Sequence, residues 1–303
     1  MKRLPILMIV GVSLLAVGCG TPSSGSLGPA PTSTAGASSP ASPPASGTAS
    51  AAASPSGQPP TATQGTAREI GVQAWFSRNG KLFVTQRSVP VAAGVGRGAL
   101  DRLLTGPSAA ENAAGLRSQI PAGTTLHGVR ISAGIATADL SSSFQAAASP
   151  SAMPLRIAQV VYTLTQFPTV TGVRFAIDGQ GVTVVGGVPV QSPQTRAMYG
   201  GYLPAITVRS PVIGAQVTSP VTVSGTADVF EATVSVRILD SAGHEIARTF
   251  TTASCGTGCR GGYSVTIPYS VPRTQPGTIE VFESSAKDGL PINVQLIPVT
   301  LAP

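Results

Sequence analysis

The sequence has few of the residue types that usually carry enzyme chemistry. Its 303 residues include two histidines, three cysteines and one tryptophan, and charged residues make up 10% of the chain. Neither His127 nor His244 lies in an H-E-x-x-H pattern, and there is no G-x-S-x-G motif. A metallohydrolase or serine hydrolase therefore has no support here, and we predict a protein without enzymatic activity or cofactor.

The basic residues are scattered, although the formal net charge is +7. A nucleic-acid-binding face needs a dense basic stripe with aromatic side chains for base stacking. Aromatic residues make up 5% of this chain. Nucleic acid is therefore not an expected partner, whereas weak attraction to anionic lipid headgroups or wall polymers is compatible with the charge.

The apolar run Leu4–Gly18 is too short for a membrane span, which needs about 20 residues. Lys2 and Arg3 precede it and Cys19 follows it, as in a secretory signal peptide over residues 1–19. The small residues before Cys19 resemble a bacterial lipobox, with Ala16 where the common motif has leucine. That resemblance implies cleavage and diacylation of Cys19, hence an extracytoplasmic protein anchored to the cell membrane. The alternatives are an ordinary signal peptide or an uncleaved anchor, either of them with an incidental cysteine.

Residues 20–67 contain no charged side chain and consist almost wholly of Ser, Thr, Ala, Gly and Pro. Such a composition cannot bury enough apolar surface to offset the entropy lost on ordering the chain. We therefore predict a disordered tether between the anchor and the folded part.

Cys255 and Cys259 lie in the segment SCGTGCRGG, where glycine permits a tight ring. If Cys19 is acylated, the two remaining cysteines can form a disulfide, and the chain then has no free thiol. A metal site would need further soft ligands, which no neighbouring residue supplies, and a redox pair is more often C-x-x-C. We predict a structural disulfide.

Residues 68–189 are expected to form one α+β domain, with a single sheet and helices packed on it. Asn79-Gly80 predicts a hairpin, and Ser108 with Glu111 has the spacing of a capping box. Strands TTLHGVRIS and IATADLS are expected to hinge at Ala133-Gly134, and a final pair, GVRFAID and GVTVVG, is expected to turn at Asp178-Gly179. A buried helical stripe is predicted at Ile157, Val160, Val161 and Leu164.

Two long segments of this region carry a family resemblance. LLTGPSAAENAAGLRSQIPAGTTLHGVRISAGIATADLSSSF and IAQVVYTLTQFPTVTGVRFAIDG resemble the GerMN domain of sporulation and germination lipoproteins. The family has no established catalytic residues, so the resemblance implies none here. It implies a role in envelope assemblies.

Residues 204–303 alternate between apolar and polar positions, which predicts an immunoglobulin-like sandwich. Turns are expected at Ala242-Gly243, Pro276-Gly277 and Asp288-Gly289. The expected strands are VTVSG, TVSVRILD, YSVTIPY, TIEVFE and INVQLIPVTL. The stretches SPVTVSGTADVFEATVSVRILD and IEVFESSAKDG resemble the immunoglobulin-like spore-germination domain, which often follows GerMN.

Three acidic residues have positions that could suggest a functional site, two in this region and one in the preceding domain. Glu231 and Glu283 each end a VFE triplet, and we expect both to face outward with the phenylalanine inside. Asp139 is expected to cap the loop that follows it.

These features predict a membrane-anchored scaffold or adaptor with two binding modules, joined by a linker at residues 190–203, and an envelope protein as its partner. One alternative is a cell-wall glycan binder that uses Trp75, Tyr199 and Tyr202 for stacking. Another is an extracytoplasmic regulator of a membrane sensor kinase.

Overall fold

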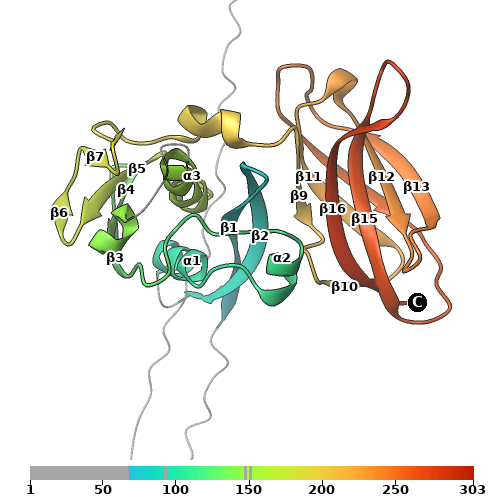
Figure 1. Cartoon of the computed structure of the whole chain (residues 1–303), viewed down its shortest axis with the longest axis horizontal. Helices are drawn as coiled ribbons and strands as arrows, with labels where there is room; N and C mark the ends of the chain where they lie inside the picture. Colours follow the sequence, from blue (N-terminus) through green and yellow to red (C-terminus); the bar gives the residue numbers. More distant parts are fainter. Residues whose placement is uncertain (1–67, 92–93, 147–148, 150–151) are drawn as a thin grey trace, which may run out of the picture. The chain divides into compact units, whose positions relative to one another are not determined.

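The computed structural model describes residues 68–91, 94–146, 149 and 152–303 (Figure 1). The predicted signal peptide, Cys19 and the expected tether over residues 20–67 lie outside the described residues. All described residues belong to one compact unit of the chain. No helix among them is long and apolar enough to cross a bilayer.

The described chain begins with the predicted hairpin. Strands β1 (Glu69–Arg78) and β2 (Lys81–Pro90) pair antiparallel over their whole length. Asn79 and Gly80 have φ angles of 52° and 73°. A two-residue turn of this kind needs positive φ at both positions, which explains why Asn-Gly is found there.

Three helices follow, and the second confirms the predicted capping box. They are α1 (Val95–Leu104), α2 (Ala109–Ala113) and α3 (Ala152–Leu164). The Ser108 hydroxyl accepts a hydrogen bond from the Glu111 backbone N–H, while the Glu111 carboxylate accepts one from the Ser108 N–H at 2.7 Å. This reciprocal capping box begins α2.

Helix α3 is buried on every side, which the predicted single stripe did not indicate. Its polar residues are satisfied by backbone groups. Arg156 donates to the carbonyl oxygens of Gln119, Phe144 and Ala146, and Gln159 donates to that of Trp75 at 2.7 Å. The helix is therefore a central element of this part of the fold.

The strands of this region form three sheets, so the expected single sheet is wrong. The hairpin β1–β2 is one, and a four-stranded sheet has the order β3-β4-β5-β6. Helix α1 contacts both the hairpin and β3, and α3 contacts both the hairpin and β5, so the helices keep these sheets apart. The strands are β3 (Leu126–Ser132), β4 (Ile135–Leu140), β5 (Gly172–Ile177) and β6 (Gln180–Gly181).

The last predicted strand of this region is also broken. The turn at Asp178-Gly179 is present, but β6 has only two residues, and a separate small hairpin follows it. That hairpin consists of β7 (Val184–Val185) and β8 (Val188–Pro189). The expected strand over residues 181–186 is interrupted at Val182 and Thr183, and Gly186 and Gly187, both with positive φ, form the turn of the small hairpin.

The segment expected to be a linker packs against the preceding region. Residues Arg196–Tyr202 form a short 3-10 helix, and Gln194 makes a β-bridge to Val173. The Arg196 guanidinium donates to the carbonyl oxygen of Tyr162 in α3 at 2.9 Å. These residues therefore form part of the folded structure.

The C-terminal region is the predicted sandwich of two sheets. One has the order β10-β16-β15-β12-β13 and the other β14-β11-β9 (Figure 1). The expected strands are β11 (Val221–Ala227), β12 (Thr233–Leu239), β14 (Gly261–Ile267), β15 (Gln275–Ser284) and β16 (Pro291–Leu301). Three strands had not been predicted: β9 (Ile206–Ser210), β10 (Gln216–Val217) and β13 (Glu245–Thr252).

One of the predicted turns is wrong. Pro276 and Gly277 lie inside β15, paired with Thr300 and Val299 of β16. A Cβ at Gly277 would collide with the side chain of Leu301, so the glycine permits close packing there. The turns at Gly243 and Gly289 are confirmed, each with positive φ.

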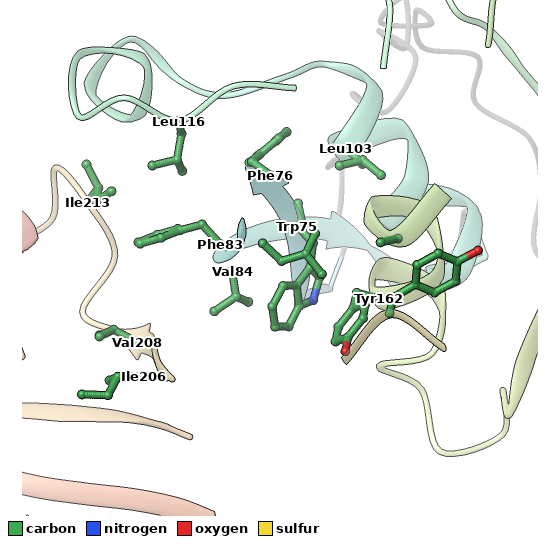
Figure 2. Packing of buried hydrophobic residues seen from close by; sticks show 14 of the residues in the cluster. Trp75, Phe76, Phe83, Val84, Leu103, Leu116, Tyr162, Ile206, Val208 and Ile213 are labelled. Carbon is green, nitrogen blue, oxygen red and sulfur yellow. The ribbon is translucent and has the colours of Figure 1, made fainter. Parts of the chain in front are cut away.

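One continuous apolar core runs through both regions. Phe83 and Leu116 belong to the same cluster as Ile206, Val208 and Ile213 (Figure 2). Full burial of a side chain of this size contributes about 1.5–3 kcal/mol. The regions are therefore joined by shared packing as well as by the chain.

Candidate binding surface on the sandwich

The loop that joins β13 to β14 contains the two cysteines of the predicted disulfide. The structure places the sulfur atoms of Cys255 and Cys259 at the distance of a disulfide, with their Cα atoms 5.5 Å apart. The Thr257 N–H donates to the carbonyl oxygen of Val229, and the Thr257 hydroxyl accepts from the Glu231 N–H. The small ring thus supports the short 3-10 turn Phe230–Ala232 that precedes β12.

Four non-glycine residues in the ring, the turn and strand β16 have positive φ angles. They are Glu231, Ala232, Thr257 and Asn293, with φ between 53° and 56°. Such backbone conformations cost free energy and persist only where the surroundings hold them. Here contacts among the Cys255–Cys259 ring, the Phe230–Ala232 turn and strand β16 keep these backbone conformations in place.

A buried carboxylate connects these segments and overturns one expectation. Glu283 is 8% exposed, and it accepts hydrogen bonds from the Phe230 N–H at 2.9 Å and from the Asn293 amide at 2.7 Å. A break in the β15–β16 register between Val281 and Glu283 accompanies this burial. The expected outward-facing Glu283 is therefore wrong, because two donors compensate the buried charge.

The phenylalanine of the other VFE triplet faces solvent, again contrary to the prediction. Phe230 is 52% exposed, and Leu290 and Ile292 at the β15–β16 turn are 62% and 42% exposed. Ile292 is the cross-strand partner of Glu283, which also binds the Phe230 backbone. These three apolar side chains are here called the tip surface. Glu283 connects the backbone segments that carry Phe230 and Ile292.

A hollow of about 610 Å³ lies on strands β12 and β13, next to the turn that carries Phe230. It is lined by Thr233, Ser235, Arg248, Thr249 and Phe250, and Thr233 directly follows the Phe230–Ala232 turn. The Phe250 side chain is 69% exposed. An apolar side chain of a partner could therefore contact Phe250 within the hollow.

The charges around the hollow are paired among themselves. Arg237 forms two hydrogen bonds of 3.0 Å to Glu280, and Arg248 pairs with Glu245. Both guanidinium groups also lie over the ring of Phe282, at 5.3 and 5.7 Å from its centroid. The two guanidinium groups cover the ring of Phe282, whereas the ring of Phe250 on the same sheet remains exposed to solvent.

Trp75 and Tyr199 do not have the exposure that glycan stacking requires. Each is 5% exposed. Trp75 packs against Tyr162 with ring centroids 4.9 Å apart, and the Tyr199 hydroxyl donates to the side-chain oxygen of Gln194. Burial raises the pKa of Tyr199 to about 12. The proposed binding role of these two rings is therefore wrong; Tyr202 is half-buried beside Tyr199.

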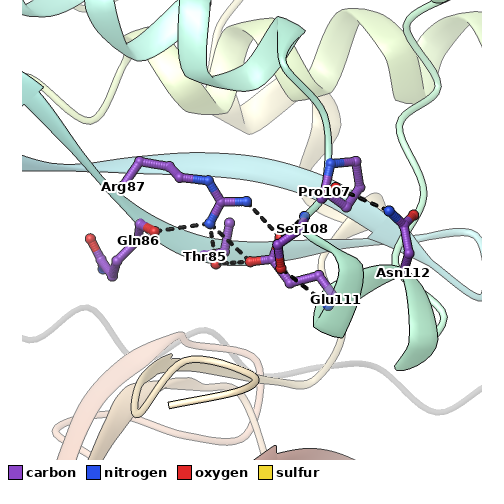
Figure 3. Close-up of polar contacts among 7 residues, drawn as sticks. All are labelled: Thr85, Gln86, Arg87, Pro107, Ser108, Glu111 and Asn112. Atoms are coloured by element: carbon purple, nitrogen blue, oxygen red, sulfur yellow. Dashed lines mark hydrogen bonds and ion pairs between the residues drawn. The ribbon is translucent and has the colours of Figure 1, made fainter. Parts of the chain in front are cut away.

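The best-buried carboxylate of the first region has a structural role (Figure 3). Glu111 is 2% exposed; besides capping α2, it accepts hydrogen bonds from Arg87 and Thr85. Burial alone would raise the pKa of Glu111, but the hydrogen bonds from Arg87, Thr85 and Ser108 outweigh it and lower that pKa. The ion pair ties strand β2 to α2.

Each histidine lies next to an aspartate. His127 Nε2 lies 3.1 Å from Asp178 Oδ1, a hydrogen bond that is the main cause of a lowered Asp178 pKa. His244 is exposed near Asp240. Asp139 accepts from the Gly179 N–H at 3.0 Å, so it caps the β5–β6 turn, and not the loop directly after it. Among the described residues there is no cluster of three or more potential metal ligands.

Comparison with protein families gives two matches in series. Residues 74–183 match the family described as sporulation and spore germination, and residues 205–290 match the immunoglobulin-like domain of bacterial spore germination. Neither description names an enzymatic activity. A search of curated proteins found no match.

Two solved structures from Bacillus subtilis are similar to parts of the chain. The tandem GerMN domains of the sporulation protein GerM are 16% identical, over 78% of this chain and 61% of that one, with a TM-score of 0.38. The first GerMN domain alone is 23% identical, over 42% of this chain and 98% of that one, with a TM-score of 0.34.

Proposed function

We propose that this chain, which carries a sporulation and spore germination domain followed by the immunoglobulin-like domain of bacterial spore germination, is a non-enzymatic adaptor of the bacterial cell envelope. Acylated Cys19 would anchor it to the membrane, and residues 20–67 would tether the two domains. The sandwich would then bind an envelope protein.

The tip surface is the observation that supports this proposal. Phe230, Leu290 and Ile292 are exposed, although the backbone that carries them is fixed by Glu283 and by the Cys255–Cys259 ring. A rigid loop loses little conformational entropy on binding. Aromatic and aliphatic residues on such a frame, beside a hollow, form the central contacts of many protein interfaces.

Cross-linking of the tagged full-length protein in its own cells, followed by mass spectrometry, tests the proposal. The test variant carries Phe230→Ser, Leu290→Ser and Ile292→Ser. The matched control carries Ile70→Ser, Val184→Ser and Met198→Ser, which are similarly exposed apolar residues of the first region. We expect one dominant envelope protein with the wild type and the control, and at least about tenfold less of it with the test variant, a loss of about 1.4 kcal/mol.

Three outcomes would contradict parts of the proposal. Equal capture by both variants would remove the tip surface from the interface. Cross-links to wall fragments alone would replace the adaptor by a glycan binder. Hydrolysis of wall material by the folded chain, abolished by one substitution, would make it an enzyme. Circular dichroism must show that both variants melt near the wild type.

A further inference from the structure

The outer face of the four-stranded sheet carries a groove that the proposed function does not use. Its volume is about 550 Å³. In β4, Ala136, Ala138 and Leu140 are buried in the core, so the alternating residues Thr137 and Asp139 face outward. The groove is lined by His127, Gly128, Val129, Arg130, Thr137, Asp139, Ala176, Gly179 and Gly181.

Two arginines flank one threonine on this face. Thr137 is paired with Arg130 of β3 on one side and with Arg174 of β5 on the other. Both arginine side chains are exposed, and neither donates a hydrogen bond or forms an ion pair within the described part of the chain. By contrast, the guanidinium groups of Arg87, Arg156, Arg196 and Arg237 all have partners.

The next set of cross-strand partners on this face has the carboxylate of Asp139 at its centre and only small residues around it. Asp139 is paired with Gly128 and Ala176, and Ala176 with Gly181, so its neighbours have one side-chain carbon or none. Asp139 Oδ1 accepts from the Gly179 N–H. Its other oxygen, Oδ2, has no partner among the described residues. A ligand group can therefore reach this oxygen without displacing a protein side chain.

We propose that the groove binds a short peptide segment that carries both a free carboxylate and a free ammonium group. The carboxylate would lie between Arg130 and Arg174, because guanidinium groups form paired hydrogen bonds with carboxylates. The ammonium would bind Asp139, two residues farther along β4 and thus about 7 Å away. Asp139 and the nearby Asp178 repel a polyanion, so the groove disfavours a phosphate polymer.

Titration of the ¹⁵N-labelled full chain with dialanine, followed by the amide signals of Gly128, Gly179 and Gly181, tests this site. We expect saturable shifts of these three signals. Dialanine with an acetylated amino end and dialanine with an amidated carboxyl end should each bind about tenfold more weakly, since each lacks one charge–charge contact. Inorganic phosphate, which has no ammonium, should also bind weakly.

Four variants assign the contacts. Arg130→Ala and Arg174→Ala should each weaken dialanine binding about tenfold. Asp139→Asn keeps an oxygen to accept from Gly179 but removes the charge, so it should bind free and acetylated dialanine equally. Arg273→Ala is the matched control, an exposed arginine of the sandwich that likewise lacks a described partner.

The proposal fails if dialanine shifts none of the three glycine signals, or if Arg273→Ala weakens binding as much as the groove variants. It also fails if phosphate or acetylated dialanine binds as tightly as the free dipeptide, because the groove would then be a simple anion site. None of these outcomes bears on the tip surface of the sandwich.

Discussion

The carboxylate of Glu283 accepts a hydrogen bond from the backbone N–H of Phe230, across 53 positions of sequence. Through its second oxygen the same carboxylate binds Asn293. One buried side chain thus joins the turn before β12, strand β15 and strand β16. Because Phe230 is itself exposed, its backbone is fixed while its ring is free to contact a partner.

Replacement of Glu283 by alanine should destabilise the sandwich. The Phe230 N–H and the Asn293 amide would lose their acceptor, at a cost of about 1–3 kcal/mol. The melting temperature should fall by roughly 2–10 °C for a chain of this size. Glu231→Ala is the control, because the Glu231 side chain is exposed. Equal melting temperatures of the two variants, measured by calorimetry, would contradict the role assigned to Glu283.

The Cys255–Cys259 bond stays a prediction that chemistry can test. Without reductant, the peptide that contains both residues should be two hydrogen masses lighter than after reduction, and neither thiol should react with iodoacetamide. The double variant Cys255→Ser, Cys259→Ser should lose about 2 kcal/mol, the value expected for closing so short a loop. Rapid alkylation of either cysteine in the folded, unreduced protein would contradict the disulfide.

The Glu111–Arg87 pair should make stability depend on pH. The folded-state pKa of Glu111 is lowered from the ordinary value of 4.5. A lowered carboxylate pKa stabilises the fold fully above the unfolded-state value, and this contribution is lost as the pH falls through the folded-state value. Glu111→Gln should therefore be less stable than wild type at pH 7, by about 1–3 kcal/mol, and the difference should shrink below pH 4.5.

Urea denaturation of both proteins at several pH values measures this difference directly. Subtraction of the variant from the wild type removes the contributions of Asp178, Asp240 and Glu245, whose pKa values are also lowered. A difference that stays constant from pH 7 to well below 4.5 would show that the ionised form of Glu111 is not favoured by folding.

Local sequence signals predicted the elements whose geometry is set locally. Asn79-Gly80 forms a turn because positive φ is accessible to these residues, and Ser108 with Glu111 caps a helix through neighbouring backbone groups. The number of sheets could not be predicted in this way. It depends on where α1 and α3 lie between strands that are distant in sequence.

The tip surface could not be predicted from the sequence for the same reason. Period-two alternation places Phe230 inside, but the turn at Glu231 and Ala232 breaks that alternation. The support for this turn comes from Glu283 and from Thr257 in the cysteine ring, which are 53 and 26 positions away from their partners in the turn. Strand β13 was missed because Phe250, its most conspicuous apolar residue, faces solvent among charged residues.

Membrane attachment through Cys19 can be tested by one substitution. Cys19→Ser removes the thiol that a diacylglyceryl group would modify, so the protein should leave the membrane fraction. Two acyl chains should hold the wild type there through high-salt washing, because each buried CH₂ contributes about 0.8 kcal/mol. The double variant Cys255→Ser, Cys259→Ser is the control and should remain with the membrane. If Cys19→Ser also remains there after the wash, attachment does not depend on acylation, and the uncleaved apolar segment Leu4–Gly18 becomes the better explanation.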